Sequence, residues 1–76
     1  MYVIEIETRN TLKKVKNPKK SRIRDMIFLD ILQVMDNNEK WHTIWSGWIG
    51  VTRGKLIVDS INSAIHSQKD YIYLDI

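Results

Sequence analysis

The chain has 76 residues, of which 43% are hydrophobic, no cysteine, and a formal net charge of +3. This length predicts one domain, residues 1–76, held by an ordinary hydrophobic core, because disulfides and thiolate–metal sites both need cysteine. Two acids interrupt the apolar N-terminal run, and no apolar stretch approaches the roughly 18 residues that span a bilayer. We therefore expect a cytoplasmic protein with no membrane partner.

The first element in the chain is a strand over residues 2–8. Tyr2, Ile4 and Ile6 alternate with the acids Glu5 and Glu7. Alternation of apolar and charged residues is typical of a strand with one buried face.

A basic segment follows, from residue 9 to residue 24. It holds eight of the twelve basic residues and none of the nine acids. The rest of the chain therefore has four basic residues and nine acids. Asn10, Asn17, Pro18 and Ser21 accompany the lysines, and Pro18 favours extended geometry at Asn17. We expect residues 9–22 to form a long basic loop, and a loop of this length is commonly functional. The basic residues are Arg9, Lys13, Lys14, Lys16, Lys19, Lys20, Arg22 and Arg24.

Residues 23–35 fit two interpretations. Ile23, Ile27, Ile31 and Val34 have helical spacing, whereas the abundance of Ile, Val and Phe favours a strand. The polar run 36–40 follows, and then a second apolar run, 41–51, rich in Trp and Ile. Two matched runs around a polar loop favour a β-hairpin over the helix.

Residues 52–54, Thr-Arg-Gly, are typical of a three-residue turn. We expect them to join 48–51 to a short strand at 55–58, followed by a helix at about 59–68 with Asp59 as its N-cap. The alternative is a helix that already runs from Lys55. The chain then ends in a strand, 71–76, with Ile72, Leu74 and Ile76 facing the core.

These elements predict a β-rich α+β fold. We expect an antiparallel sheet of four to five strands, or a small half-open barrel, with one short helix before the last strand.

The catalytic motifs that we considered do not occur in the chain. It has two histidines, no cysteine and no Gly-x-Ser-x-Gly elbow, and its acids and histidines do not cluster with metal-ligand spacing. We therefore expect no enzymatic activity, no metal and no cofactor.

The basic segment 9–24 and the aromatic residues are the candidate contact surfaces. Dense positive charge without an acid attracts the phosphates of nucleic acids, and it also attracts an acidic protein surface. Trp41, Trp45 and Trp48 lie within eight residues. In a regular strand Trp41 and Trp45 share one face and Trp48 takes the other, so at least one of them is expected at an interface. Tyr71 and Tyr73 share the outer face of the last strand and would extend an edge for a homodimer.

Two functions follow from these surfaces. The first is a small non-catalytic protein that contacts nucleic-acid phosphates through segment 9–24. The alternative is an inhibitor or adaptor of a phage or mobile element, suggested by the Ile- and Lys-rich composition. It would bind and occlude a host protein of replication, transcription or defence, as a dimer, with Trp48, Tyr71 and Tyr73 among its contacts.

Overall fold

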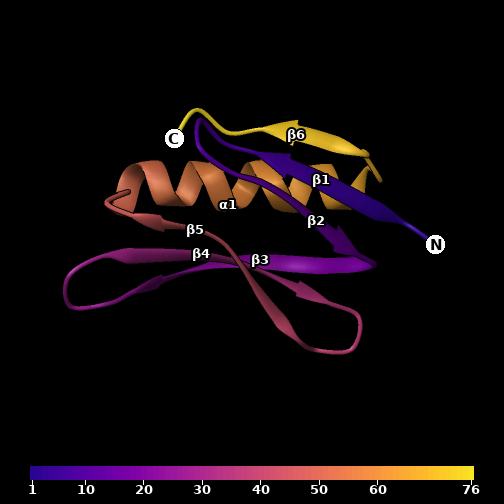
Figure 1. Cartoon of the computed structure of the whole chain (residues 1–76), viewed down its shortest axis with the longest axis horizontal. Helices are drawn as coiled ribbons and strands as arrows, with labels where there is room; N and C mark the ends of the chain where they lie inside the picture. Colours follow the sequence, from indigo (N-terminus) through magenta and orange to yellow (C-terminus); the bar gives the residue numbers. More distant parts are fainter.

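The structure is a computed structural model that describes all 76 residues. The fold is α+β, with six strands in two sheets of three and one helix (Figure 1). The strands are β1 (Val3–Glu7), β2 (Leu12–Lys16), β3 (Pro18–Asp25), β4 (Asp30–Asp36), β5 (Trp41–Gly47) and β6 (Tyr71–Tyr73). The helix α1 (Val51–His66) lies between β5 and β6 in the chain.

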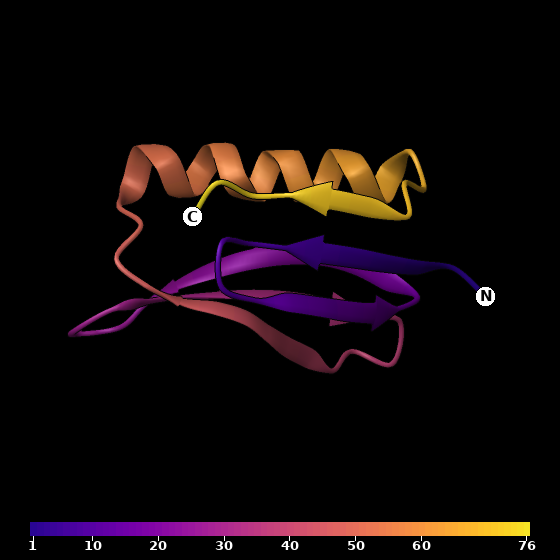
Figure 2. The ribbon, with the colours of Figure 1, turned by 45° about the horizontal axis from the view of Figure 1, so that its top comes forward.

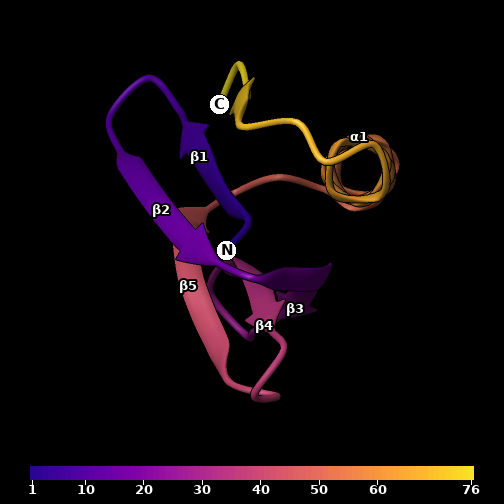
Figure 3. The same cartoon turned by 90° about the vertical axis from the view of Figure 1, so that its right-hand side faces the viewer.

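The first sheet has the order β2-β1-β6. β1 pairs with β2 in antiparallel register, with Ile4 opposite Val15, and with β6 in parallel register, with Ile6 opposite Ile72. The parallel pair joins the two ends of the chain, and Figures 2 and 3 show β6 on the side of β1 away from β2, at the edge of the sheet. Ile4, Ile6 and Val15 are buried, so the alternation predicted for residues 2–8 is confirmed.

The second sheet has the order β3-β4-β5 and is antiparallel throughout. β4 and β5 form the hairpin expected around residues 36–40. The strand interpretation of residues 23–35 is confirmed for 30–35 only, since β3 ends at Asp25 and a turn follows, and the run 41–51 is a strand only as far as Gly47. Leu32 and Val34 point inward and are fully buried. An irregularity in the β4–β5 register between Leu32 and Gln33 shifts the faces of β5.

The core lies between the two sheets and α1. Viewed along its axis in Figure 3, α1 lies beside β3, on the side away from β2. Ile57, Ile61 and Ile65 form its buried stripe, as the spacing predicts. The buried core residues are Ile4, Ile6, Val15, Leu32, Val34, Ile44, Ile49, Ile57, Ile61, Ala64, Ile65, Leu74 and Ile76.

The expectation of a long basic loop over residues 9–22 is wrong, because this segment forms β2 and the first part of β3. Each of these strands lies at the end of its sheet. An end strand tolerates several lysines and an initial proline, since one edge lacks a strand partner. The segment also has few apolar residues because its buried positions include a polar one, Ser21.

A sharp corner at Asn17 separates β2 from β3. Its φ of 48° lies in the left-handed region, so the extended geometry expected before Pro18 is also wrong. Asn17 N–H donates to the carbonyl of Tyr2 at 2.6 Å, and Asn37 N–H donates to the carbonyl of Asn17 at 2.9 Å. Asparagine adopts this conformation more readily than most residues, and these bonds hold it there.

The hairpin expected at residues 52–54 is wrong as well, because α1 begins at Val51 and continues to His66. Gly54 lies inside the helix, where a Cβ atom would come within 3.0 Å of the Ile23 side chain. This glycine therefore permits a close approach between α1 and β3 and makes no turn. Asp59 is a mid-helix residue, and Gly50 takes the N-cap position, with φ of 86°.

The fold class was predicted in part. The α+β class and the single helix before the last strand are confirmed, while the four to five strands become six. The strands form two separate sheets with no closed barrel, and the β1–β6 pair is parallel.

Candidate binding surfaces

The eight basic residues of segment 9–24 do not share one surface. Three of them lie within 4.0 Å of a carboxylate: Arg9 beside Asp75 at 2.8 Å, Lys14 beside Glu5 at 3.7 Å, and Lys19 beside Glu39 at 4.0 Å. The other five make no ion pair within the chain: Lys13, Lys16, Lys20, Arg22 and Arg24. The field of the segment is therefore partly neutralised and divided between two sheets.

Three of the five unpaired residues lie on one face of β3. Lys20, Arg22 and Arg24 alternate along the strand, so their side chains point to the same side, away from the helix. We call this surface the basic sheet face. Its other members, taken from the strand registers, are Ile31, Gln33 and Met35 of β4 and Trp41, Thr43 and Ser46 of β5. It contains no acidic residue.

Arg22 and Trp41 form the centre of the basic sheet face. The guanidinium carbon of Arg22 lies 3.8 Å from the centroid of the Trp41 ring, which is a close cation–π contact. Arg22 Nε donates a hydrogen bond to Gln33 Oε1 at 2.9 Å, and Gln33 Nε2 donates to Thr43 Oγ1 at 3.2 Å. These contacts fix the position of a partly buried cation and of the partly buried aromatic ring beneath it.

The three tryptophans occupy three different environments. The register irregularity places Trp41 opposite Met35 on the outer face, but Trp45 opposite the buried Leu32. The prediction that Trp41 and Trp45 share a face is therefore wrong. Trp45 packs against the core with its ring over the backbone of Gly47, where a Cβ would lie 2.4 Å from the ring. Trp48 follows β5 and is 76% exposed.

The outer face of the first sheet carries mixed charges. Lys14 lies opposite Glu5, while Tyr71 and Tyr73 of β6 lie beside Glu5 and Glu7. The hydroxyl of Tyr71 donates to Glu7 Oε1 at 2.6 Å, and this bond to the carboxylate raises the pKa of Tyr71. The two tyrosines are about half exposed, as predicted for the outer side of the last strand.

An apolar end of the molecule was missed by the sequence analysis. The turn between β3 and β4 exposes Ile27 at 92% and Phe28 at 91%, and Trp48 and Val51 are exposed nearby. The β4–β5 register brings the two segments to the same end, since Asp30 lies opposite Gly47. We call Ile27, Phe28, Trp48 and Val51 the apolar end. Its signal in the sequence is the apolar run Met26–Leu29 between two aspartates, although the composition of this run predicts part of a strand.

A pocket of about 440 Å³ lies beside the apolar end. Its apolar walls are Ile23, Trp48, Val51 and Val58, and three aspartates and one lysine line it as well: Asp25, Asp30, Asp59 and Lys55. Ile23 and Asp25 alternate with Arg22 and Arg24 along β3, so the pocket and the basic sheet face lie on opposite sides of this strand.

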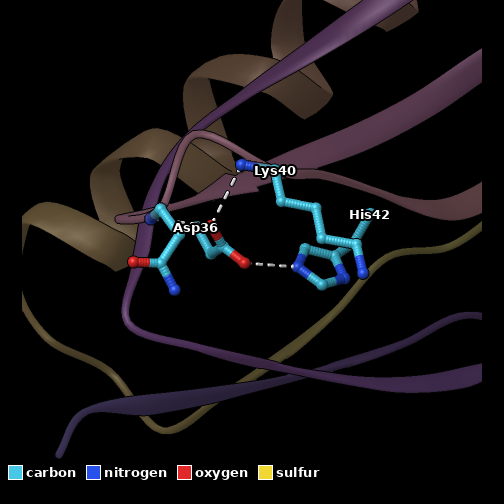
Figure 4. A network of polar contacts seen from close by, with 4 residues as sticks. Asp36, Lys40 and His42 are labelled. Carbon is cyan, nitrogen blue, oxygen red and sulfur yellow. Dashed lines mark hydrogen bonds and ion pairs between the residues drawn. The ribbon is translucent and has the colours of Figure 1, made fainter.

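The turn between β4 and β5 contains the remaining polar network (Figure 4). Asp36 Oδ2 lies 2.8 Å from Nε2 of His42, and Asp36 Oδ1 accepts from the backbone N–H groups of Asn38 and Lys40. The bond to His42 is the main cause of the lowered pKa of Asp36. The network closes the hairpin, and we assign it a structural role.

The structure contains no group of three or more His, Asp or Glu side chains that would hold a metal ion. The structure has no helix that combines the length and the apolar character needed to cross a membrane. Comparisons of this chain with protein-family models, with curated proteins and with solved structures gave no match.

Proposed function

We propose that this protein binds nucleic acid through the basic sheet face. The observation that carries the proposal is the row of Lys20, Arg22 and Arg24, which lie on one acid-free face next to Trp41. Lysine and arginine neutralise backbone phosphates, and an aromatic ring on a sheet is a platform on which an unpaired base stacks.

The geometry favours a single strand over a duplex. Alternate residues of a strand are about 6.6 Å apart, so the three cations form an extended row across an open surface. The indole of Trp41, which is partly exposed within this row, suits an unstacked base, whereas the bases of a duplex are already stacked on one another. The paired Arg9, Lys14 and Lys19 contribute less, because their carboxylate partners compete with phosphate.

Fluorescence anisotropy with a labelled oligothymidylate tests the proposal. Three phosphate contacts to a single strand predict a slope of log affinity against log salt of about −2, or roughly a 20-fold loss between about 50 and 200 mM salt. The double variant Lys20→Glu, Arg24→Glu should abolish binding, because it reverses two of the three charges on the face.

The matched control is Arg53→Glu, Lys69→Glu, which makes the same change of net charge on the helix and in the turn after it. This variant should keep most of the affinity. Affinity that does not depend on salt, or an equal loss in both double variants, would contradict a contact at the basic sheet face. Tighter binding to a duplex of the same length would contradict the preference for single strands.

A second function is supported by the apolar end. Exposing four large apolar side chains to water at one end is energetically unfavourable for a monomer, and such patches are common where a protein partner binds. The protein would then act as an inhibitor or adaptor that covers part of a host protein. β6 has only one strand neighbour, β1, so its free edge beside Tyr71 and Tyr73 is where a second copy would pair in a dimer.

A further inference from the structure

The pocket beside the apolar end differs from the rest of the surface in both charge and wall chemistry. It combines the indole of Trp48 and three aliphatic side chains with three carboxylates and a single ammonium group. Its local charge is opposite to that of the basic sheet face. A ligand for this pocket therefore carries a positive charge on an apolar stem.

Asp30 lies in the wall of the pocket and is 93% buried, since its exposed fraction is 7%. Its Oδ2 accepts hydrogen bonds from the N–H groups of Ile49 at 3.0 Å and Gly50 at 3.1 Å. These bonds fix the carboxylate and shape the segment that leads into α1. Oδ1 makes no hydrogen bond within the chain, but it is not an enclosed atom, since every enclosed side-chain oxygen has a partner, so it is open to solvent and can accept a hydrogen bond.

Trp48 contributes a second, independent feature. Its ring lines the pocket although the residue is 76% exposed, so its surface lacks an intramolecular partner. A cation held near an indole is attracted by the ring quadrupole, and Arg is the cation that most often occupies such positions. Asp25 and Asp59 lie in the same pocket, where they would pair with that cation.

We propose that this pocket binds an arginine or lysine side chain of a protein partner, while the apolar residues next to that side chain pack on Ile27 and Phe28. The inference rests on the second proposed function and names the chemistry of its partner. The charge of the pocket excludes a phosphate group as the occupant. An arginine or lysine side chain suits the lining of the pocket, because its methylene stem would contact the aliphatic walls while its charged end reaches the carboxylates.

Two-dimensional ¹⁵N–¹H NMR with a tripeptide tests the proposal. The probe is acetyl-Leu-Arg-Leu-amide, and its partner is the same peptide with citrulline, which is neutral and nearly isosteric with arginine. The arginine peptide should shift the indole N–H of Trp48 and the amides of Ile49 and Gly50. The citrulline peptide should bind roughly tenfold more weakly, as expected for the loss of an ion pair and a cation–π contact.

The double variant Asp25→Asn, Asp59→Asn should remove the preference for arginine, and Trp48→Leu should weaken binding of the arginine peptide more than that of the citrulline peptide. All three residues are exposed, so the dispersion of the spectrum should show that these variants remain folded. The matched control is Glu39→Gln, Asp70→Asn, which removes two exposed carboxylates outside the pocket and should keep the preference.

Equal affinity for the two peptides, or shifts on the basic sheet face instead of at Trp48, would overturn the proposal. Shifts of the same amides when the protein alone is diluted would identify a second copy as the occupant and would also overturn it. If the wild-type protein shows no preference for the arginine peptide but still binds a protein partner, this inference alone is rejected, because the apolar end would remain the contact surface.

Discussion

Polar side chains inside this molecule have partners, and these partners come from distant parts of the chain. Ser21 is buried in β3, and both its backbone N–H and its hydroxyl donate to Asn62 Oδ1 at 2.8 Å. No buried side-chain nitrogen or oxygen is left without a hydrogen bond. Because an unpaired buried polar group costs about 1–3 kcal/mol, such pairs let a strand with few apolar residues pack on the helix.

The carboxylate of Asp36 makes a pH-dependent contribution to stability. Its hydrogen bond with His42 and those from Lys40 and Asn38 lower its pKa in the folded protein below 3.8, the ordinary value. Its stabilising contribution is therefore fully present above pH 3.8 and is lost as the pH falls through the lowered folded pKa. Asp36→Asn should lower the melting temperature near about pH 6, and the difference from the wild type should shrink below about pH 3.

Thermal unfolding followed by circular dichroism measures this difference. Asp70→Asn is the control, because the side chain of Asp70 makes no ion pair or hydrogen bond. A gap between Asp36→Asn and the wild type that stays constant down to about pH 2 would show that the charge of Asp36 contributes nothing.

The elements differ in how well local patterns predict them. Among the strands with one apolar face, β1 was predicted close to its observed bounds. β4 and β5 were predicted as a hairpin, but the expected runs, 23–35 and 41–51, extend beyond the observed strands. β2 and the first part of β3 were not predicted as strands, because end strands carry polar residues on positions that inner strands need for packing. The start of α1 was also missed, since Gly54 looks like a turn residue unless the close approach of β3 is known.

Helix packing gives a test of the role of Gly54. Gly54→Leu should destabilise the protein by about 1–3 kcal/mol, because the new side chain would be forced against Ile23 and would push α1 away from β3. Urea unfolding measures the change. Thr52→Leu, on the exposed side of the same helix, should change stability by less than about 0.5 kcal/mol. If both variants unfold at the same urea concentration, the close contact has no energetic role.

At the scale of the whole molecule, the two proposed contact surfaces are physically separate. Arg22 and Arg24 point outward from β3, and Ile23 and Asp25 line the pocket on its other side. Substitutions on one side of a strand that share no partners with the other side should act independently. The protein would then bind nucleic acid on one side and a protein partner on the other.

A pull-down from cell extract, repeated with nuclease, tests this separation. Lys20→Glu, Arg24→Glu should lose every partner that nuclease also removes, while a partner captured through the apolar end should survive nuclease and be lost with Trp48→Ala. Loss of the same partners in both variants would show that the two surfaces act as one. A partner set unchanged in both would reject both proposed functions.

The linear sequence by itself determined the α+β class, the first strand, the central hairpin, the buried stripe of the helix and the acid-free basic segment. These features depend on local periodicity and composition, which do not require knowledge of the segments that pack against them. Only the tertiary structure decided the division of the basic residues, because pairing with acids depends on contacts between distant segments. The same holds for Trp45 and Trp48, since the register irregularity between β4 and β5 places Trp45 opposite the buried Leu32, whereas Trp48 lies beyond the end of β5 and is exposed.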